Sequence, residues 1–218
     1  MIEGHFIVLE GIDGSGTTTQ TGRLADALRS RGLPAHTTRE PSDGPIGMLI
    51  RQVLTGRLVV PGSTGGRAPS WSTMACLFAA DRLDHLEAEI HPNLRDGVTV
   101  ISDRYDASSV AYQSISSGLE LDASVIDWIR TVNSRARRPD LTLVLDVPVA
   151  EANRRRRQRQ GRVEIYDDDE LQAALARFYT DIDAFFPTDR IVHIDANRSV
   201  DEVAADVLRA VEDLRRLG

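Results

Sequence analysis

A chain of 218 residues with 41% hydrophobic and 27% charged residues has the composition of a soluble globular protein, and we expect one domain over residues 1–218. The net charge of -7 argues against a general nucleic-acid-binding protein, because such proteins present positive surfaces to phosphates. Cys76 is the one cysteine, which excludes a disulfide within the chain, and no apolar run is long enough to cross a bilayer. The first residues also lack the basic region and cleavage site of a signal peptide, so we expect a cytoplasmic protein that binds neither nucleic acid nor membrane.

Apolar runs and helical patterns alternate along the chain. Runs rich in β-branched residues predict strands at 6–9, 34–38, 98–101, 141–147 and 191–194. Apolar residues at helical spacing are clearest over 22–31 and Val200–Leu217. This alternation predicts an α/β fold, a parallel sheet with helices on both faces and ligands beyond the carboxyl ends of its strands. The Gly/Pro/Ser-rich segment 57–70 predicts a mobile surface loop.

The segment 8–20, "VLEGIDGSGTTTQ", follows the first predicted strand and opens a helix. Its glycines and hydroxyl match a phosphate-binding loop, in which Gly is followed after four residues by Gly, Lys and Ser or Thr. Backbone N–H groups at such a helix start bind polyphosphate, and the hydroxyl can bind Mg²⁺. The alternative is a glycine-rich turn without a ligand, but strand, spacing and hydroxyl together favour a nucleotide site. The predicted nucleotide-binding residues are Gly11, Ile12, Asp13, Gly14, Ser15, Gly16, Thr17 and Thr18.

Thr17 occupies the position of the loop lysine. All 26 basic residues of the chain are arginine, yet an arginine at this position would have kept the charge. Thr17 offers a hydroxyl and its N–H but no charge, and losing one transition-state donor lowers rates by about 10²–10³. Nucleotide binding depends less on this group, because the backbone N–H groups and Mg²⁺ remain. The loop therefore predicts nucleotide binding and leaves turnover dependent on another cation.

The segment 154–162, "RRRRQRQGR", is a second source of positive charge. One interpretation is a solvated face or a patch for acidic partners, and the following "VEIYDDDE" could neutralise it. Beside a phosphate loop without lysine, a basic segment that closes over the nucleotide could instead act as an arginine finger in cis. We hypothesise that one of its arginines fills the space beside Thr17. The candidates are Arg154, Arg157, Arg159 and Arg162.

Two further motifs predict an acceptor site. The segment 101–113, "ISDRYDASSVAYQ", places Asp103 and Arg104 after a strand, where Asp103 could orient a hydroxyl or a metal's water shell and Arg104 could bind phosphate. The alternative is a structural Asp–Arg ion pair. The segment 75–85, "ACLFAADRLDH", puts Phe78 and Arg82 on one helical face, which suits a planar base with carbonyl acceptors. Core packing is the alternative for Phe78, because leucines lie nearby.

Together these motifs resemble the thymidylate kinase family. The resemblance is carried by "FIVLEGIDGSG", "TREPSDGPIG", "LFAADR", "SDRYDASSVAYQ", "LTLVLDVP" and "RRRRQRQGRVEIYD", in this order along most of the chain. It implies a P-loop nucleoside-monophosphate-kinase fold with a five-stranded parallel sheet, and a homodimer. It also implies transfer of the γ-phosphoryl group of ATP to dTMP, giving dTDP, with Mg²⁺.

The resemblance also implies roles for particular residues. Implied dTMP contacts are Asp13 and Arg39 near the sugar or phosphate, Phe78 stacked on thymine, Arg82 and Gln113 at the base edge, Arg104 on the phosphate and Tyr105 beside the deoxyribose. Thr18 and Asp103 are the implied metal residues, with Asp103 beside the reacting groups. A lid over about 154–167 is implied to carry the catalytic arginines, as in the family arrangement that lacks an arginine in the loop.

Thr17 is the departure from the family pattern, which has lysine there. It keeps two alternatives open besides an active dTMP kinase. One is a catalytically weak or silent nucleotide-binding protein of the same fold, acting as a sensor. The other is a kinase for a different pyrimidine monophosphate, which the combination of Phe78, Arg82 and Tyr105 disfavours.

Overall fold

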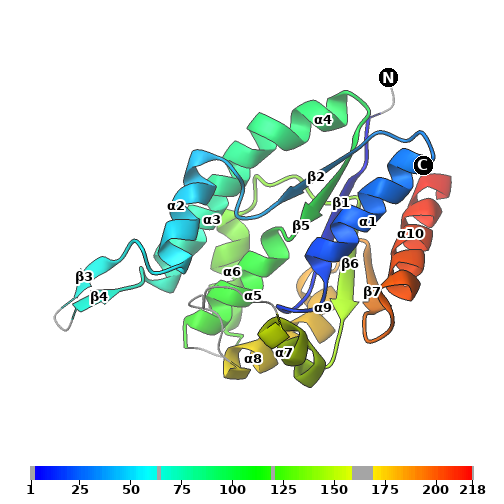
Figure 1. Ribbon diagram of the computed structural model, residues 1–218. Helices are drawn as coiled ribbons and strands as arrows, with labels where there is room; N and C mark the ends of the chain where they lie inside the picture. Colours follow the sequence, from blue (N-terminus) through cyan, green and yellow to red (C-terminus); the bar gives the residue numbers. More distant parts are fainter. Residues whose placement is uncertain (1–2, 63–64, 119–120, 159–168, 218) are drawn as a thin grey trace.

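A central parallel sheet organises the protein in the computed structural model, which describes residues 3–62, 65–118, 121–158 and 169–217 (Figure 1). The sheet has five strands in the order β2-β5-β1-β6-β7. Their bounds are β1 (Phe6–Glu10), β2 (Ala35–Arg39), β5 (Thr99–Asp103), β6 (Leu141–Asp146) and β7 (Ile191–Asp195). All five predicted strands and the predicted fold class are therefore confirmed.

The register of the sheet brings functional positions together at one edge. Leu9 of β1 pairs with Asp103 of β5 on one side and with Leu143 of β6 on the other. The carboxyl end of β1, where the phosphate loop begins, consequently lies between the carboxyl ends of β5 and β6. This is where ligands bind in open α/β sheets.

Helices pack on both faces of the sheet. Their bounds are α1 (Thr17–Ser30), α2 (Pro45–Leu54), α3 (Trp71–His85), α4 (His91–Arg95), α5 (Asp106–Ser116), α6 (Ala123–Val132), α7 (Val149–Gln158), α8 (Asp169–Thr180), α9 (Ile182–Phe185) and α10 (Val200–Leu217). A π-helical turn, η1 (Leu86–Ile90), joins α3 to α4. The bounds of α10 are those predicted from its apolar spacing, and α1 begins before the predicted residue 22.

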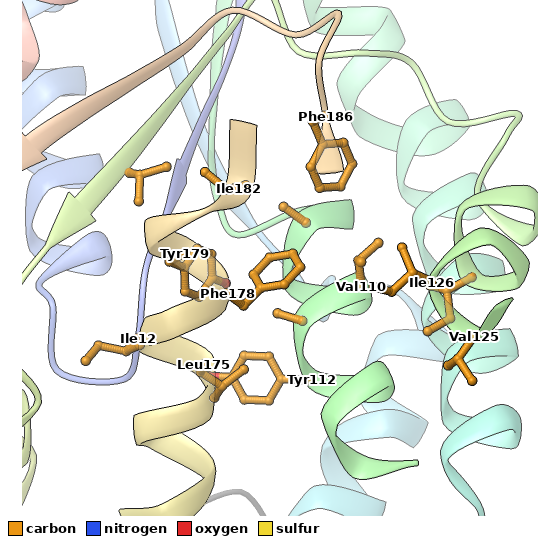
Figure 2. Close-up of a cluster of buried hydrophobic side chains, with 14 of the residues drawn as sticks. Ile12, Val110, Tyr112, Val125, Ile126, Leu175, Phe178, Tyr179, Ile182 and Phe186 are labelled. Carbon is orange, nitrogen blue, oxygen red and sulfur yellow. The ribbon is translucent and has the colours of Figure 1, made fainter. Parts of the chain in front are cut away.

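Alternating residues of β1 face two different hydrophobic clusters. Ile7 and Leu9 lie in the cluster formed with α1 and α10, whereas Phe6 and Val8 lie in the one formed with η1 and α4. Both faces of the strand are thus buried, as expected for a central parallel strand. A further cluster joins α5, α6 and α8 to Ile12 of the phosphate loop (Figure 2).

The segment 57–70, for which a mobile surface loop was expected, contains regular structure. It contains an antiparallel hairpin, β3 (Val60–Gly62) paired with β4 (Gly65–Arg67), that projects away from the sheet beyond α2 (Figure 1). Its described residues are exposed or half-buried, as expected for a surface segment, but they include a pair of strands. Among the described residues, no helix is both long and apolar enough to span a membrane.

Candidate functional site

The loop between β1 and α1 has the geometry of a phosphate cradle. Gly14 and Gly16 adopt φ angles of 93° and 107°, a left-handed conformation that side chains disfavour. Gly16 precedes the first helical residue, and no side-chain cap for the first N–H groups of this helix is found among the residues that the structure describes. These N–H groups and the helix dipole are therefore available to an anion.

The phosphate loop is in direct contact with α7. A Cβ atom on Gly14 would lie 2.4 Å from the carbonyl oxygen of Ala152, so only glycine fits between loop and helix. Within α7, Glu151 accepts hydrogen bonds from Arg154 at 2.6 Å and from Arg155 at 2.7 Å. The helix that starts the arginine-rich segment thus rests on the loop. Two of the candidate lid arginines, Arg159 and Arg162, lie outside the described residues, and Arg157 is exposed at the end of α7.

A pair of oxygen-bearing side chains lies beside the phosphate loop. Thr18 Oγ1 donates a hydrogen bond to Asp103 Oδ2 at 2.5 Å, although the two residues are far apart in sequence. The other carboxylate oxygen, Asp103 Oδ1, is buried and has no hydrogen-bond partner within the part of the chain that the structure describes. Hydroxyl and carboxylate oxygens are the ligands that Mg²⁺ prefers. The donor set at this position therefore fits a magnesium ion.

Arg104 lies at the end of β5 in a left-handed conformation, with φ of 72°. Its Nη2 is 2.5 Å from Asp13 Oδ1, its Nη1 donates to Ser108 Oγ at 3.1 Å, and its guanidinium lies over the ring of Tyr112. Burial alone would lower the pKa of Arg104, but the nearby Tyr112 and Asp13 raise it, so the guanidinium remains charged. The alternative of an Asp103–Arg104 ion pair is not what forms: Arg104 pairs with Asp13.

A cavity of about 220 Å³ adjoins Arg104. It is bounded by α3, α5, the phosphate loop and the turn after β2. Most of the predicted dTMP contacts line it, namely Asp13, Phe78, Arg82, Arg104, Tyr105 and Gln113. Among the described residues, three buried polar atoms of these side chains have no hydrogen-bond partner: Nε of Arg82, Oη of Tyr105 and Oε1 of Gln113. The cavity therefore combines the ring of Phe78 with an unused guanidinium donor, an unused amide acceptor and an unused phenol hydroxyl.

The remaining predicted dTMP contact, Arg39, is not among the residues that line this cavity. It is exposed at the end of β2 and pairs with Asp43 at 2.8 Å. Its neighbours Glu40 and Pro41 line the cavity instead. Within the "TREP" motif, the charged side chain that lines the cavity is therefore that of Glu40, which was not among the predicted site residues.

Glu40 contacts Arg82, whose side chain is almost wholly buried. Arg82 Nη2 donates to Glu40 Oε2 at 2.5 Å and to Ser109 Oγ at 3.0 Å, and Nη1 donates to Asn133 Oδ1. The guanidinium also lies 5.0 Å from the ring centre of Tyr105. Both Nη atoms thereby donate to protein groups, whereas Nε has no hydrogen-bond partner among the described residues.

Glu10 is a second functional candidate that the sequence analysis missed. This fully buried carboxylate at the end of β1 accepts hydrogen bonds from Tyr105 N at 2.9 Å, Ser108 N at 3.3 Å, Ser108 Oγ at 2.7 Å and Tyr179 Oη at 2.8 Å. Burial raises its pKa to about 7, against the opposing influence of Arg104 and these donors. Figure 2 shows Tyr179 on α8 among the apolar residues that enclose this region. A single glutamate before a glycine carries no sequence signal for such burial.

Comparisons with known proteins identify the family. A family model described as thymidylate kinase matches residues 9–207. The probable thymidylate kinase of Pyrococcus horikoshii is 41% identical over 211 residues, which cover 97% of each chain. That of Thermococcus kodakarensis is 40% identical over 210 residues, covering 96% of this chain and 98% of the relative. That of Pyrobaculum calidifontis is 40% identical over 216 residues, covering 97% and 100%. The protein therefore belongs to the thymidylate kinase family.

Proposed function

We propose that this protein transfers the γ-phosphoryl group of ATP to the 5′-phosphate of dTMP, giving dTDP. The observation that carries the proposal is that Phe78, Arg82, Gln113 and Arg104 line one cavity. We call Arg104 the phosphate clamp, because its guanidinium would bind the acceptor phosphate. The curated relatives are named probable thymidylate kinases, which supports dTMP as the acceptor.

The unused polar atoms of the cavity match the hydrogen-bonding edge of thymine. Thymine has an acceptor, O4, beside a donor, N3–H. Arg82 Nε could donate to O4 and Gln113 Oε1 could accept from N3–H, which would satisfy two buried groups that now lack partners. Cytosine has a donor and an acceptor at these two positions, so it would leave both protein groups unsatisfied. The ring of Phe78 offers a stacking surface for the base.

The acceptor phosphate and sugar would lie toward the phosphate loop. Arg104 keeps its charge and lines the cavity next to Asp13, so it can bind a phosphate as a planar fork. Asp13 would contact the sugar or phosphate region. Tyr105, which is buried against Phe6, would lie beside the deoxyribose, where its bulk disfavours a 2′-hydroxyl.

The ATP phosphates would bind at the start of α1, with Mg²⁺ held by Thr18 and Asp103. The unpartnered oxygen of Asp103 supports this assignment. Bound Mg²⁺ supplies positive charge that neutralises phosphate oxygens. Thr18 and Asp103 would hold the metal, while the N–H groups around Gly16 would bind phosphate oxygens through the backbone.

The charge that Thr17 lacks would come from the arginine-rich lid. The supporting observation is that α7 touches the phosphate loop at Gly14, so the arginines that follow Ala152 start next to the nucleotide. A guanidinium that approaches the β- and γ-phosphates from this side would act as an arginine finger in cis. Arg154, Arg157, Arg159 and Arg162 remain the candidates.

A coupled assay of dTMP-dependent ADP formation from MgATP tests this function. We expect turnover well above the ATP-only background, with dTDP as the second product. Thr17 favours one alternative, a silent nucleotide-binding protein. That protein would form no ADP above background, although dTMP would still raise its melting temperature.

We also propose that the protein is a homodimer. Exposed apolar side chains on α2 and α3 support a covered surface there: Met48 is 57% exposed, and Leu49 and Leu83 are each 41% exposed. Light scattering during gel filtration should give twice the 24.0 kDa mass of one chain. Replacement of Leu83 by Glu should shift the protein toward the monomer.

A further inference from the structure

Arg104 holds a backbone conformation that an arginine does not adopt without support. A side chain in the left-handed region costs about 1–3 kcal/mol, so neighbouring groups must maintain it. Arg104 N donates to Leu9 O at 2.9 Å, and Ser102 Oγ donates to Arg104 O at 2.7 Å. The next peptide is held by Glu10, whose Oε1 accepts from Tyr105 N at 2.9 Å. Glu10 therefore fixes the backbone on the carboxyl side of the clamp residue.

Glu10 also reaches the guanidinium of Arg104 through one intermediate. Arg104 Nη1 donates to Ser108 Oγ, and the same hydroxyl donates to Glu10 Oε2 at 2.7 Å. The hydrogen bonds thus lead from the Arg104 guanidinium through the Ser108 hydroxyl to the Glu10 carboxylate. Because the hydroxyl gives its proton to an anion, its oxygen is a stronger acceptor for the guanidinium.

Nothing in the proposed chemistry needs Glu10 itself. It is fully buried, it is absent from the cavity lining, and the cavity side of the network is formed by Ser108 and Arg104. A buried carboxylate is costly, since it must be removed from water. Its four hydrogen-bond donors all belong to Tyr105, Ser108 and Tyr179, which places it at the base of the clamp.

We propose that Glu10 is a positioning residue for the phosphate clamp: through the Tyr105 N–H and the Ser108 hydroxyl, its carboxylate holds Arg104 in the orientation that binds the acceptor phosphate. This inference rests on the proposed function, because it takes Arg104 as the group that binds the phosphate of dTMP. A simple charge argument predicts the opposite effect, since a negative charge behind the clamp would repel a phosphate. Removing the charge of Glu10 should therefore weaken dTMP binding if Glu10 positions Arg104, and strengthen it if Glu10 only repels the phosphate.

The test compares dTMP with thymidine, which has the same base and sugar but no phosphate. Dissociation constants are measured by calorimetry, with thymidine by competition, at pH 8.5, where a group of pKa about 7 is ionised. We expect Glu10→Gln to weaken dTMP binding about tenfold, or about 1.4 kcal/mol, and to leave thymidine binding within about twofold. Gln keeps the shape and one oxygen, so the turn can still form. Unchanged or tighter dTMP binding, or equal losses for both ligands, would overturn the proposal.

A second variant covers the case in which Glu10→Gln does not fold. Ser108→Ala removes the intermediate hydroxyl and leaves Glu10 in place, and we expect about a threefold loss for dTMP alone. Ser114→Ala is its matched control, because Ser114 is a buried serine of the same helix whose hydroxyl bonds only to backbone carbonyls of that helix. It should change neither affinity. A Ser108 variant that behaves like the control would contradict the proposal.

Arg104→Gln separates this inference from the proposed function. If Arg104 binds the acceptor phosphate, this variant loses dTMP affinity relative to thymidine, and adding Glu10→Gln then costs nothing more. If Arg104→Gln leaves the ratio of dTMP affinity to thymidine affinity unchanged, Arg104 does not bind the acceptor phosphate. If Arg104→Gln lowers the ratio of dTMP affinity to thymidine affinity, and adding Glu10→Gln lowers dTMP affinity a further tenfold, only the role of Glu10 is refuted.

Discussion

Arg82 and Glu40 form an ion pair inside the protein, with Nη2 2.5 Å from Oε2 and side chains only 1% and 3% exposed. Burying two charges is costly, and here Ser109 and Asn133 accept further hydrogen bonds from the Nη atoms of Arg82. The pair also decides which nitrogen of Arg82 is left for a ligand. Glu40, from the turn after β2, thereby orients a side chain of α3 toward the cavity.

Breaking this pair should destabilise the protein strongly. Glu40→Gln leaves the charge of Arg82 buried without a counter-ion, and we expect the free energy of unfolding to fall by about 3–5 kcal/mol. Urea denaturation followed by circular dichroism measures the change. Asp26→Asn is the control, because it removes an exposed ion pair with Arg29 and should cost less than about 1 kcal/mol. Similar losses in the two variants would contradict the structural account.

Stability should fall with rising pH because of His85, whose side chain is 1% exposed. Burial alone would lower its pKa, but the carboxylates of Glu40 and Glu89, which lie 3.5 Å and 3.3 Å from its ring nitrogens, outweigh burial and raise the pKa to about 9 from an ordinary 6.5. The folded state therefore binds a proton that the unfolded state loses above pH 6.5. The stabilisation is fully present below that pH and is lost as the pH rises through about 9.

Urea denaturation between pH 6 and 10 tests the His85 prediction. We expect the wild-type free energy of unfolding to decline by up to about 3 kcal/mol over this range, in excess of the decline in His85→Gln. Because burial raises the pKa of Glu10, its ionisation also lowers the free energy of unfolding as the pH rises. That loss falls between about pH 4.5 and about pH 7, below the range in which His85 acts. Equal slopes for wild type and His85→Gln above pH 7 would show that His85 does not carry this charge.

The contact between the phosphate loop and α7 predicts different results for two glycines. Gly14→Ala and Gly16→Ala both place a side chain at positive φ, but only at Gly14 would the new Cβ meet another backbone, that of Ala152. We expect each to cost about 1–2 kcal/mol for backbone strain, and Gly14→Ala to cost clearly more because α7 must move. Thermal unfolding and ATP affinity measure the difference. Equal effects would mean that α7 does not rest on the loop.

Restoring lysine tests the compensation by lid arginines. Thr17→Lys should make Arg→Ala changes at the candidate lid positions less harmful to kcat, because the ammonium then supplies the charge. Loss of the acting arginine should lower kcat by about 10²–10³ in the wild-type background and by much less beside Lys at position 17. Arg209→Ala, at an exposed position on α10, is the control. Additive effects for every arginine tested would argue against compensation.

Sequence patterns predicted the sheet well because buried parallel strands are continuous apolar runs. The glycine spacing of the phosphate loop and the four-residue spacing of Phe78 and Arg82 on one helix are also local properties, so the sequence could place them on their elements. Contacts between distant segments left no such pattern. The pairing of Arg104 with Asp13, not with Asp103, depends on the left-handed turn at Arg104 and could not be deduced from adjacency.

Glu10, Glu40 and His85 were missed for a related reason. Each is an isolated charged residue in the sequence, and single charges usually lie at the surface. Glu40 and His85 are buried where the turn after β2 meets helix α3, and Glu10 is buried beside Tyr105, Ser108 of α5 and Tyr179 of α8. Composition does not encode these contacts between distant segments. The hairpin within 57–70 was missed because glycine and proline are common to irregular loops and to tight turns.

The central claim is that the cavity selects a thymine nucleotide for phosphoryl transfer, and the ratio of kcat/KM for dTMP to that for dCMP tests it most directly. With saturating MgATP, we predict a ratio of about a hundredfold or more, because cytosine would leave Arg82 Nε and Gln113 Oε1 unsatisfied. Equal values for the two nucleotides would contradict the account, and so would bound dTMP that is never converted to dTDP.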